Sequence, residues 1–259
     1  MKWYQLPLLV LALNGSAVRG EIQTRSIEYR DQDVTLAGHL AWDDAVSGKR
    51  PGVLVVHEWW GLNNYARSRA EQLARLGYVA FALDMYGKGK LTEHPQQAGE
   101  WASAIRKNTD AWQQRARAGL DILRQQATVD HSRLAAIGYC FGGSTVLQLA
   151  YGGERLKGVV SFHGSLPAAS PAQLKKLTAG ILVCHGAADA FIPAEQIDKF
   201  RGALSQSSAD WQMIYYAGAR HSFTNPGADQ RGIENIKYDK RADQRSWNHM
   251  KTFFAELFR

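Results

Sequence analysis

Cysteine is scarce in this chain, whose 259 residues contain only Cys140 and Cys184. Two cysteines allow one disulfide at most, which excludes the heavily cross-linked scaffolds of small secreted proteins. Cys184 falls within an apolar run, where a free buried cysteine is common, so we expect no disulfide and assign Cys184 to packing. His, Cys and Asp residues do not recur at metal-ligand spacing, so we expect no metal site.

Long hydrophobic runs, repeats and linkers rich in proline, glycine or serine are missing as well. Residues 21–259 are therefore expected to form one domain. The formal charge of +7 is dispersed over helical patterns without interleaved aromatic residues. This distribution favours solvated helix faces over a nucleic-acid-binding surface.

The first 20 residues differ from the rest of the chain. A basic start at Lys2 precedes an apolar block at 6–13 and small residues at 15–17. This order is typical of a secretory signal peptide, and the block is too short to span a bilayer. We expect cleavage after Ala17 or Gly20 and a periplasmic or secreted protein. The alternative is a cytoplasmic protein with an ordinary leader.

Strand and helix patterns alternate from residue 52 onward. Strand-like apolar runs cover 53–56, 78–83, 159–162 and 181–186, and helical spacing covers 64–76, 96–108, 110–125, 194–206 and 238–258. Asn63 or Asn64 is the expected cap of the first helix. Such alternation predicts an α/β fold with a mostly parallel central sheet, flanked by helices, and a site at the carboxyl ends of its strands.

The segment before residue 51 has a different pattern. Residues 26–30 and 34–40 alternate with a period of two around a turn at 31–33. This pattern predicts an antiparallel ribbon ahead of the parallel sheet.

The segment 138–143, Gly-Tyr-Cys-Phe-Gly-Gly, follows an apolar strand pattern and precedes a helical one. The form Gly-x-nucleophile-x-Gly at such a junction marks a sharp turn that exposes a nucleophile in α/β-hydrolases. Small residues permit the tight backbone, and the helix N-terminus that follows favours a thiolate. The pattern therefore nominates Cys140 as a nucleophile.

Two later strand patterns lead into an acid and a base. Asp189 follows the run at 181–186, and His221 follows the run at 211–216. The chain order nucleophile, acid, base is the one expected of this fold, and a thiol needs an oriented base beside it. His163 also follows a strand and remains an alternative base.

Five segments together resemble the dienelactone hydrolase (carboxymethylenebutenolidase) family, from about Val34 to the C-terminus. They are His-Glu-Trp-Trp-Gly-Leu-Asn at 57–63, Asp-Met-Tyr-Gly at 84–87, the turn at 138–143, Gly-Ala-Ala-Asp at 186–189 and His-Ser-Phe at 221–223. The resemblance implies an α/β-hydrolase fold in which Cys140 is the nucleophile, Asp189 the acid and His221 the base. It also implies that Glu58 contacts the resting thiol and helps to generate the thiolate.

The fold also suggests which groups surround the reacting atoms. The oxyanion hole is built from the N–H after the nucleophile and one from an early strand-end loop, which nominates Phe141 and Trp59. The other aromatic residues at strand ends suggest an apolar pocket wall formed by Trp60, Tyr86 and Phe223. The His57–Glu58 pair begins like a zinc-protease motif, but Gly61 stands where the second histidine would be.

The chain departs from the family at the substrate carboxylate. Family members that cleave dienelactones hold this group with two arginines, and the corresponding positions here are Lys88 and Asn225. Lysine lacks the planar fork of arginine, and asparagine brings no charge. We therefore expect Lys88 and Asn225 to contact substrate, but neutral esters or lactones to be cleaved at least as well as anionic dienelactones.

The resemblance predicts a cofactor-independent hydrolase, expected to be a monomer, that acts on a small ester or lactone through an acyl-thiol intermediate. One alternative is a thioesterase or activated-amide hydrolase with the same triad. A second, from another class, is a non-catalytic binding or thiol-redox protein on this scaffold.

Overall fold

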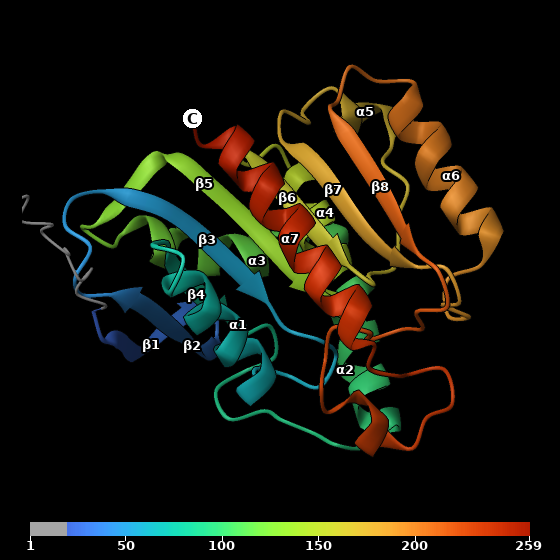
Figure 1. Ribbon diagram of the computed structural model, residues 1–259, viewed down its shortest axis with the longest axis horizontal. Helices are drawn as coiled ribbons and strands as arrows, with labels where there is room; N and C mark the ends of the chain where they lie inside the picture. The colour runs from blue at the N-terminus through green and yellow to red at the C-terminus, as the bar shows by residue number, and fades with distance from the viewer. Residues whose placement is uncertain (1–19) are drawn as a thin grey trace, which may run out of the picture.

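Eight strands form one sheet in the computed structural model, which describes residues 20–259 (Figure 1). In spatial order they are β1 (Ile22–Asp31), β2 (Val34–Asp43), β4 (Val79–Leu83), β3 (Arg50–Val56), β5 (Val129–Tyr139), β6 (Gly158–Phe162), β7 (Gly180–Gly186) and β8 (Trp211–Tyr216). Strands β4, β3 and β5 to β8 are parallel to one another, whereas β1, β2 and β4 pair antiparallel. The predicted α/β sheet with an N-terminal antiparallel ribbon is confirmed.

The ribbon is longer than the sequence pattern indicated. Pairing of β1 with β2 continues unbroken from Asp31 opposite Val34 to Ile22 opposite Asp43. Much of β1 is exposed at the edge of the sheet, so its outer residues carry little apolar signal. Of the predicted leader, only Gly20 lies within the described residues.

Helices cover both faces of the sheet. They are α1 (Asn64–Ala74), α2 (Pro95–Arg106), α3 (Thr109–Arg124), α4 (Phe141–Tyr151), α5 (Pro171–Leu174), α6 (Ala194–Ser205) and α7 (Lys240–Leu257), with a 3-10 turn η1 (Ala228–Arg231). The predicted cap is confirmed at Asn63, whose side chain accepts a hydrogen bond from the N–H of Ala66. Within residues 20–259, no helix combines the length and apolar character needed to cross a membrane.

Two apolar cores lie on opposite faces of the sheet. Successive residues of β3 point alternately into them, Val53 and Val55 toward α1 and α7 and Leu54 and Val56 toward α3 and α4. Figure 1 shows α1 and α7 in front of the sheet and α3 and α4 behind it. A strand buried on both faces reads as a continuous apolar run, which is why these strands were evident in the sequence.

The carboxyl ends of the parallel strands bring the predicted site residues to one edge of the sheet. Glu58 follows β3, Cys140 follows β5, Asp189 follows β7 and His221 follows β8. Parallel strands place such ends together, so residues up to 163 positions apart in sequence meet in space, as from Glu58 to His221.

Candidate active site

Cys140 occupies a strained turn between β5 and α4. Its backbone has φ +53° and ψ −113°, a region that residues with a side chain rarely adopt. The flanking glycines make the turn possible. A Cβ on Gly138 would lie 2.0 Å from the carbonyl oxygen of Gly142, and one on Gly142 would lie 2.2 Å from that of Val56. The turn therefore requires glycine at both positions and presents the Cys140 side chain at the start of a helix.

His221 and Asp189 form a buried pair beside this turn. Nδ1 of His221 lies 2.8 Å from Oδ2 of Asp189, and both residues are less than one-tenth exposed. The loop that carries His221 is held by its backbone. His221 forms an isolated β-bridge with Ile236, its N–H donates to the carbonyl of Asn235, and its carbonyl accepts from the N–H of Lys237. The carboxylate fixes Nδ1 as the protonated nitrogen, which leaves Nε2 for proton transfer.

The pKa of His221 lies well above its ordinary value of 6.5. Burial alone would lower this pKa, but the charges of Cys140 and Asp189, together with a hydrogen bond to each, outweigh burial. A histidine of raised pKa, oriented by a carboxylate and placed beside a cysteine, is the arrangement that can activate a cysteine nucleophile.

Glu58 is almost completely buried, and its two carboxylate oxygens are both occupied. Oε1 accepts a hydrogen bond of 2.7 Å from the Ser222 hydroxyl, and Oε2 accepts one of 2.6 Å from the Asn225 amide. Burial raises the pKa of Glu58, and these two donors oppose the rise. Among the described residues no hydrogen bond joins Glu58 to Cys140, and both carboxylate oxygens bond to other residues.

His163 supports the turn from behind. Its Nδ1 accepts a hydrogen bond of 3.2 Å from the N–H of Cys140, and its Nε2 lies 2.7 Å from Oγ1 of Thr224. Burial lowers the pKa of His163 well below 6.5, and the charges of His221 and Arg69 lower it further. Both ring nitrogens are engaged, and in residues 20–259 no carboxylate bonds to the ring, so we assign His163 to positioning Cys140 instead of proton transfer.

His57 fixes the peptide group that joins Glu58 to Trp59. Its Nε2 accepts from the N–H of Met85 at 3.2 Å, so Nδ1 carries the proton and donates to the Glu58 carbonyl at 2.5 Å. Because a trans peptide is planar, holding this carbonyl directs the N–H of Trp59 to the opposite side. In the described part of the chain that N–H has no acceptor, so it is available to a substrate.

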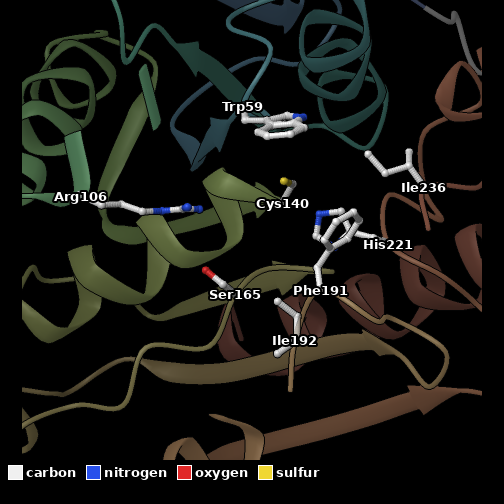
Figure 2. A pocket seen from close by; sticks show the side chains of 8 residues that line it. All are labelled: Trp59, Arg106, Cys140, Ser165, Phe191, Ile192, His221 and Ile236. Carbon is white, nitrogen blue, oxygen red and sulfur yellow. The ribbon is translucent and has the colours of Figure 1, made fainter. Parts of the chain in front are cut away.

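A cavity of about 180 Å³ opens beside Cys140 and His221. Figure 2 shows its lining, in which Trp59 lies across from Phe191 and Ile192 and the Arg106 side chain extends toward Cys140. Ser165 and Ile236 complete the lining. The cavity is mostly apolar, with the candidate nucleophile, base and one cation on its walls.

Residues 36–258 match the sequence model of the Dienelactone hydrolase family. The chain belongs to this family. The match spans both the parallel sheet and every segment that carries the candidate site. The chain is therefore a hydrolase of the dienelactone hydrolase type.

Solved structures and curated relatives agree with this membership. The chain is 41% identical to m3DLH, with a TM-score of 0.90 over 92% of this chain and 99% of that one. It is 38% identical to P91, a dienelactone hydrolase-like promiscuous phosphotriesterase from metagenomic libraries. The TM-score is 0.89, over 92% of this chain and 99% of P91. A provisionally named carboxymethylenebutenolidase of Yersinia pestis is 28% identical over 85% of this chain and 84% of the relative.

Lys88 and Asn225 stand where dienelactone-cleaving family members carry arginine. We expected both to contact substrate, but neither lines the cavity. Lys88 forms an ion pair with Glu28 on β1, is more than half exposed and does not line the cavity. Asn225 is buried and donates to Glu58. We therefore no longer assign Lys88 or Asn225 to substrate binding.

The predicted aromatic wall is not found at the cavity, because Trp60, Tyr86 and Phe223 are not among the residues that line it. Trp60 is buried beneath the guanidinium of Arg231, and Phe223 packs edge-on against His163. Both support the site from outside the cavity. Tyr86 packs against Phe141, whose backbone N–H begins α4 and has no partner within the helix.

Five cavity residues were not identified from the sequence. Phe191 and Ile192 directly follow the Asp189 turn, and Ser165 follows the strand that leads to His163, so nearness to a predicted site residue was an available signal. Arg106 and Ile236 lie at a helix end and in a loop far from the motifs. Only tertiary packing brings these last two to the cavity. Among residues 20–259, no group of His, Cys, Asp and Glu could hold a metal ion.

Proposed function

We propose that this protein cleaves a carboxylic ester or lactone by transferring its acyl group to Cys140. The observation that carries the proposal is the buried His221–Asp189 pair, 2.8 Å apart, beside a cysteine held at positive φ on a shared cavity. A thiol needs a base oriented by an acid to act as a nucleophile near neutral pH, and this geometry supplies both.

In the first half-reaction His221 takes the proton of Cys140, and the thiolate attacks the carbonyl carbon. The negative charge that develops on oxygen is received by the N–H groups of Phe141 and Trp59, each worth about 2.7–4 kcal/mol in comparable oxyanion holes. The C–O bond then breaks, and the leaving oxygen takes the proton from His221. An acyl thioester on Cys140 remains.

In the second half-reaction a water molecule enters the cavity and gives a proton to His221. The resulting hydroxide attacks the thioester, the C–S bond breaks, and the carboxylic acid leaves. The thiolate of Cys140 and the protonated ring of His221 are restored, so the cycle as written requires no cofactor.

The chain's second cysteine provides a matched control for the nucleophile. Cys140→Ala is expected to lower turnover of 4-nitrophenyl butyrate by roughly a thousandfold or more, because removal of a triad nucleophile leaves only binding and the oxyanion hole. Cys184 lies in β7 and contacts the Tyr216 hydroxyl on the opposite face of the sheet. Cys184→Ala is expected to retain turnover. Wild-type activity in the Cys140→Ala protein would contradict the proposal.

A further inference from the structure

The two N–H groups proposed for the oxyanion hole come from separate parts of the chain. The N–H of Trp59 belongs to the loop after β3, and that of Phe141 is the first of α4. Among the described residues, no backbone hydrogen bond joins these two residues to each other. A hole made of two donors works only when both point at one oxygen, so other groups have to fix their relative placement.

The ring of His57 contacts both parts. The residue is completely buried, and its Nδ1 bonds to the carbonyl of Glu58, which belongs to the same peptide group as the Trp59 N–H. The ring also packs against the ring of Phe141, with centroids 6.1 Å apart and planes at 30°. One side chain therefore holds the peptide group of the first donor and touches the residue that supplies the second.

The loop at 84–87 determines which nitrogen of this ring carries the proton. Nε2 of His57 accepts from the N–H of Met85 at 3.2 Å, which leaves the proton on Nδ1 to be donated to the Glu58 carbonyl at 2.5 Å. Burial lowers the pKa of His57, so the ring stays neutral near pH 7. A neutral imidazole suits this place because one of its nitrogens accepts while the other donates.

We propose that His57 is a positioning residue for the oxyanion hole, which holds the Trp59 N–H through the Glu58 carbonyl and Phe141 through ring packing. His57 takes no part in proton transfer, because both its nitrogens are engaged and it does not line the cavity. The inference rests on the proposed function and adds to it a residue that acts only while charge develops on the substrate oxygen.

Two reactions of Cys140 separate this role from a purely structural one. Acylation by 4-nitrophenyl butyrate places negative charge on the carbonyl oxygen and therefore uses the oxyanion hole. Alkylation by iodoacetamide forms a C–S bond at a saturated carbon while the C–I bond breaks and iodide leaves, so no oxyanion develops. Both reactions require the thiolate. A residue that acts through the oxyanion hole changes the first rate and leaves the second unchanged.

Two variants of similar size differ in the bond to the Glu58 carbonyl. His57→Leu removes this bond and is expected to lower kcat/KM for the ester about a hundredfold, mainly through kcat, the cost of a misplacement of about 1 Å. His57→Asn can still donate to the carbonyl from its amide and is expected to be about tenfold more active than His57→Leu, which corresponds to one restored hydrogen bond. Iodoacetamide should alkylate Cys140 in both variants at nearly the wild-type rate.

His39→Leu is the matched control. This histidine lies on β2, is also buried and does not line the cavity. Its replacement should leave the rates of acylation and alkylation unchanged, which shows that loss of a buried histidine alone does not impair the site.

The protonated nitrogen of His57 can be measured on the unmodified protein, whether or not the variants fold. Heteronuclear NMR of protein with isotope-labelled histidine should show His57 as a neutral ring with its proton on Nδ1 at pH 7. A proton on Nε2, or a doubly protonated ring, would overturn the inference, because the bonds to Met85 and Glu58 could not then both form as described.

The proposed function and this inference fail differently. If the wild-type protein neither cleaves the ester nor is acylated, the acyl-transfer proposal fails, and the position of the His57 proton still decides whether the ring is held as described. If the ester is cleaved, three results overturn the inference: ester and iodoacetamide rates that fall together in His57→Leu, an ester rate that does not fall, or His57→Asn no more active than His57→Leu.

Discussion

At the scale of single residues, two glycines determine whether the turn can present the proposed nucleophile, Cys140. The positive φ of Cys140 is tolerated only because the backbones of Gly138 and Gly142 pack where a Cβ cannot fit. Close packing against β3 holds the turn in this strained conformation. The N–H of Cys140 also donates to the carbonyl of Phe162 and to Nδ1 of His163, which fixes the backbone further.

Gly142→Ala is predicted to disrupt this turn, because its Cβ would lie 2.2 Å from the backbone oxygen of Val56, an atom that cannot move without shifting β3. We expect at least a hundredfold loss of kcat/KM and a destabilisation of about 1–3 kcal/mol. Gly202→Ala in α6 is the control. Its Cβ would meet nothing within 4 Å, and in a helix interior alanine stabilises by about 0.5–1 kcal/mol. Equal activity and melting temperature for both variants would refute this explanation.

The side chains that hold Glu58 allow a prediction with a defined pH dependence. Burial raises the pKa of Glu58 above 4.5, so the folded state retains a proton that the unfolded state loses as the pH rises. Folding therefore loses stability as the pH increases from 4.5 through the raised pKa. Asn225 opposes this loss by donating to the carboxylate.

Asn225→Leu removes one of the two donors to Glu58 and is predicted to destabilise the protein by about 1–3 kcal/mol at pH 8. The deficit should be smaller at pH 5 than at pH 8, because the raised pKa leaves a larger share of Glu58 protonated at the lower pH, and the protonated form needs the donor less. Urea denaturation of both proteins at the two pH values measures the difference. A deficit of equal size at pH 5 and pH 8 would show that Asn225 acts through packing alone.

At the scale of elements, one buried arginine connects α1 to α7 behind the site. The guanidinium of Arg69 on α1 bonds to Asp243 on α7 at 2.6 Å and to the carbonyl of Thr224 at 2.5 Å. It also stacks on the rings of Tyr65, Tyr139 and Trp247. Thr224 in turn contacts His163, so this arginine links the outer helices to the support of Cys140.

Arg69→Met is predicted to destabilise folding by about 3–5 kcal/mol, because it removes a buried guanidinium and leaves the mostly buried carboxylate of Asp243 without its charged partner. Arg75→Met, at the C-cap of the same helix, is the matched control. Its side chain is 57% exposed and its pair with Glu71 is 4.0 Å long, so its loss should change stability by about 0.5 kcal/mol or less. Chemical denaturation measures both changes, and equal effects would argue against the Arg69 connection.

The sequence predicted most elements because their physical signals are local. Continuous apolar runs identified the buried parallel strands, and helical spacing with the Asn63 cap identified α1. The candidate site could be predicted because Cys140 lies in a recognisable turn motif and because Asp189 and His221 follow strands whose carboxyl ends converge. The position of Arg106 and the partners of Glu58 could not be predicted this way, because both depend on how distant loops and α2 pack over the sheet edge.

At the scale of the whole molecule, most of the site is built from residues that follow strands of one sheet, joined by Arg106 at the end of α2 and Ile236 in the loop before α7. Its main residues therefore belong to the part of the chain after residue 20. We propose that the preceding segment serves export to the periplasm or the exterior and is absent from the working protein.

Removal of this segment is predicted to give a mature N-terminus between Val18 and Glu21, because the small residues at 15–17 and 20 follow the apolar block. N-terminal sequencing of the protein isolated from its native cell, with fractionation of the cell compartments, measures this. Protein that begins at Met1 in the cytoplasmic fraction would contradict the proposal.

The most direct test of the acyl-transfer mechanism is to isolate the acyl-enzyme. The protein is mixed with 4-nitrophenyl butyrate, quenched in acid within the first turnovers, and digested for peptide mass analysis. The mechanism predicts one butyryl group per chain, on the peptide that contains Cys140, and none on that peptide in Cys140→Ala. A butyryl group on Ser165 or Ser222, or turnover without any covalent adduct in wild type and variant alike, would contradict it.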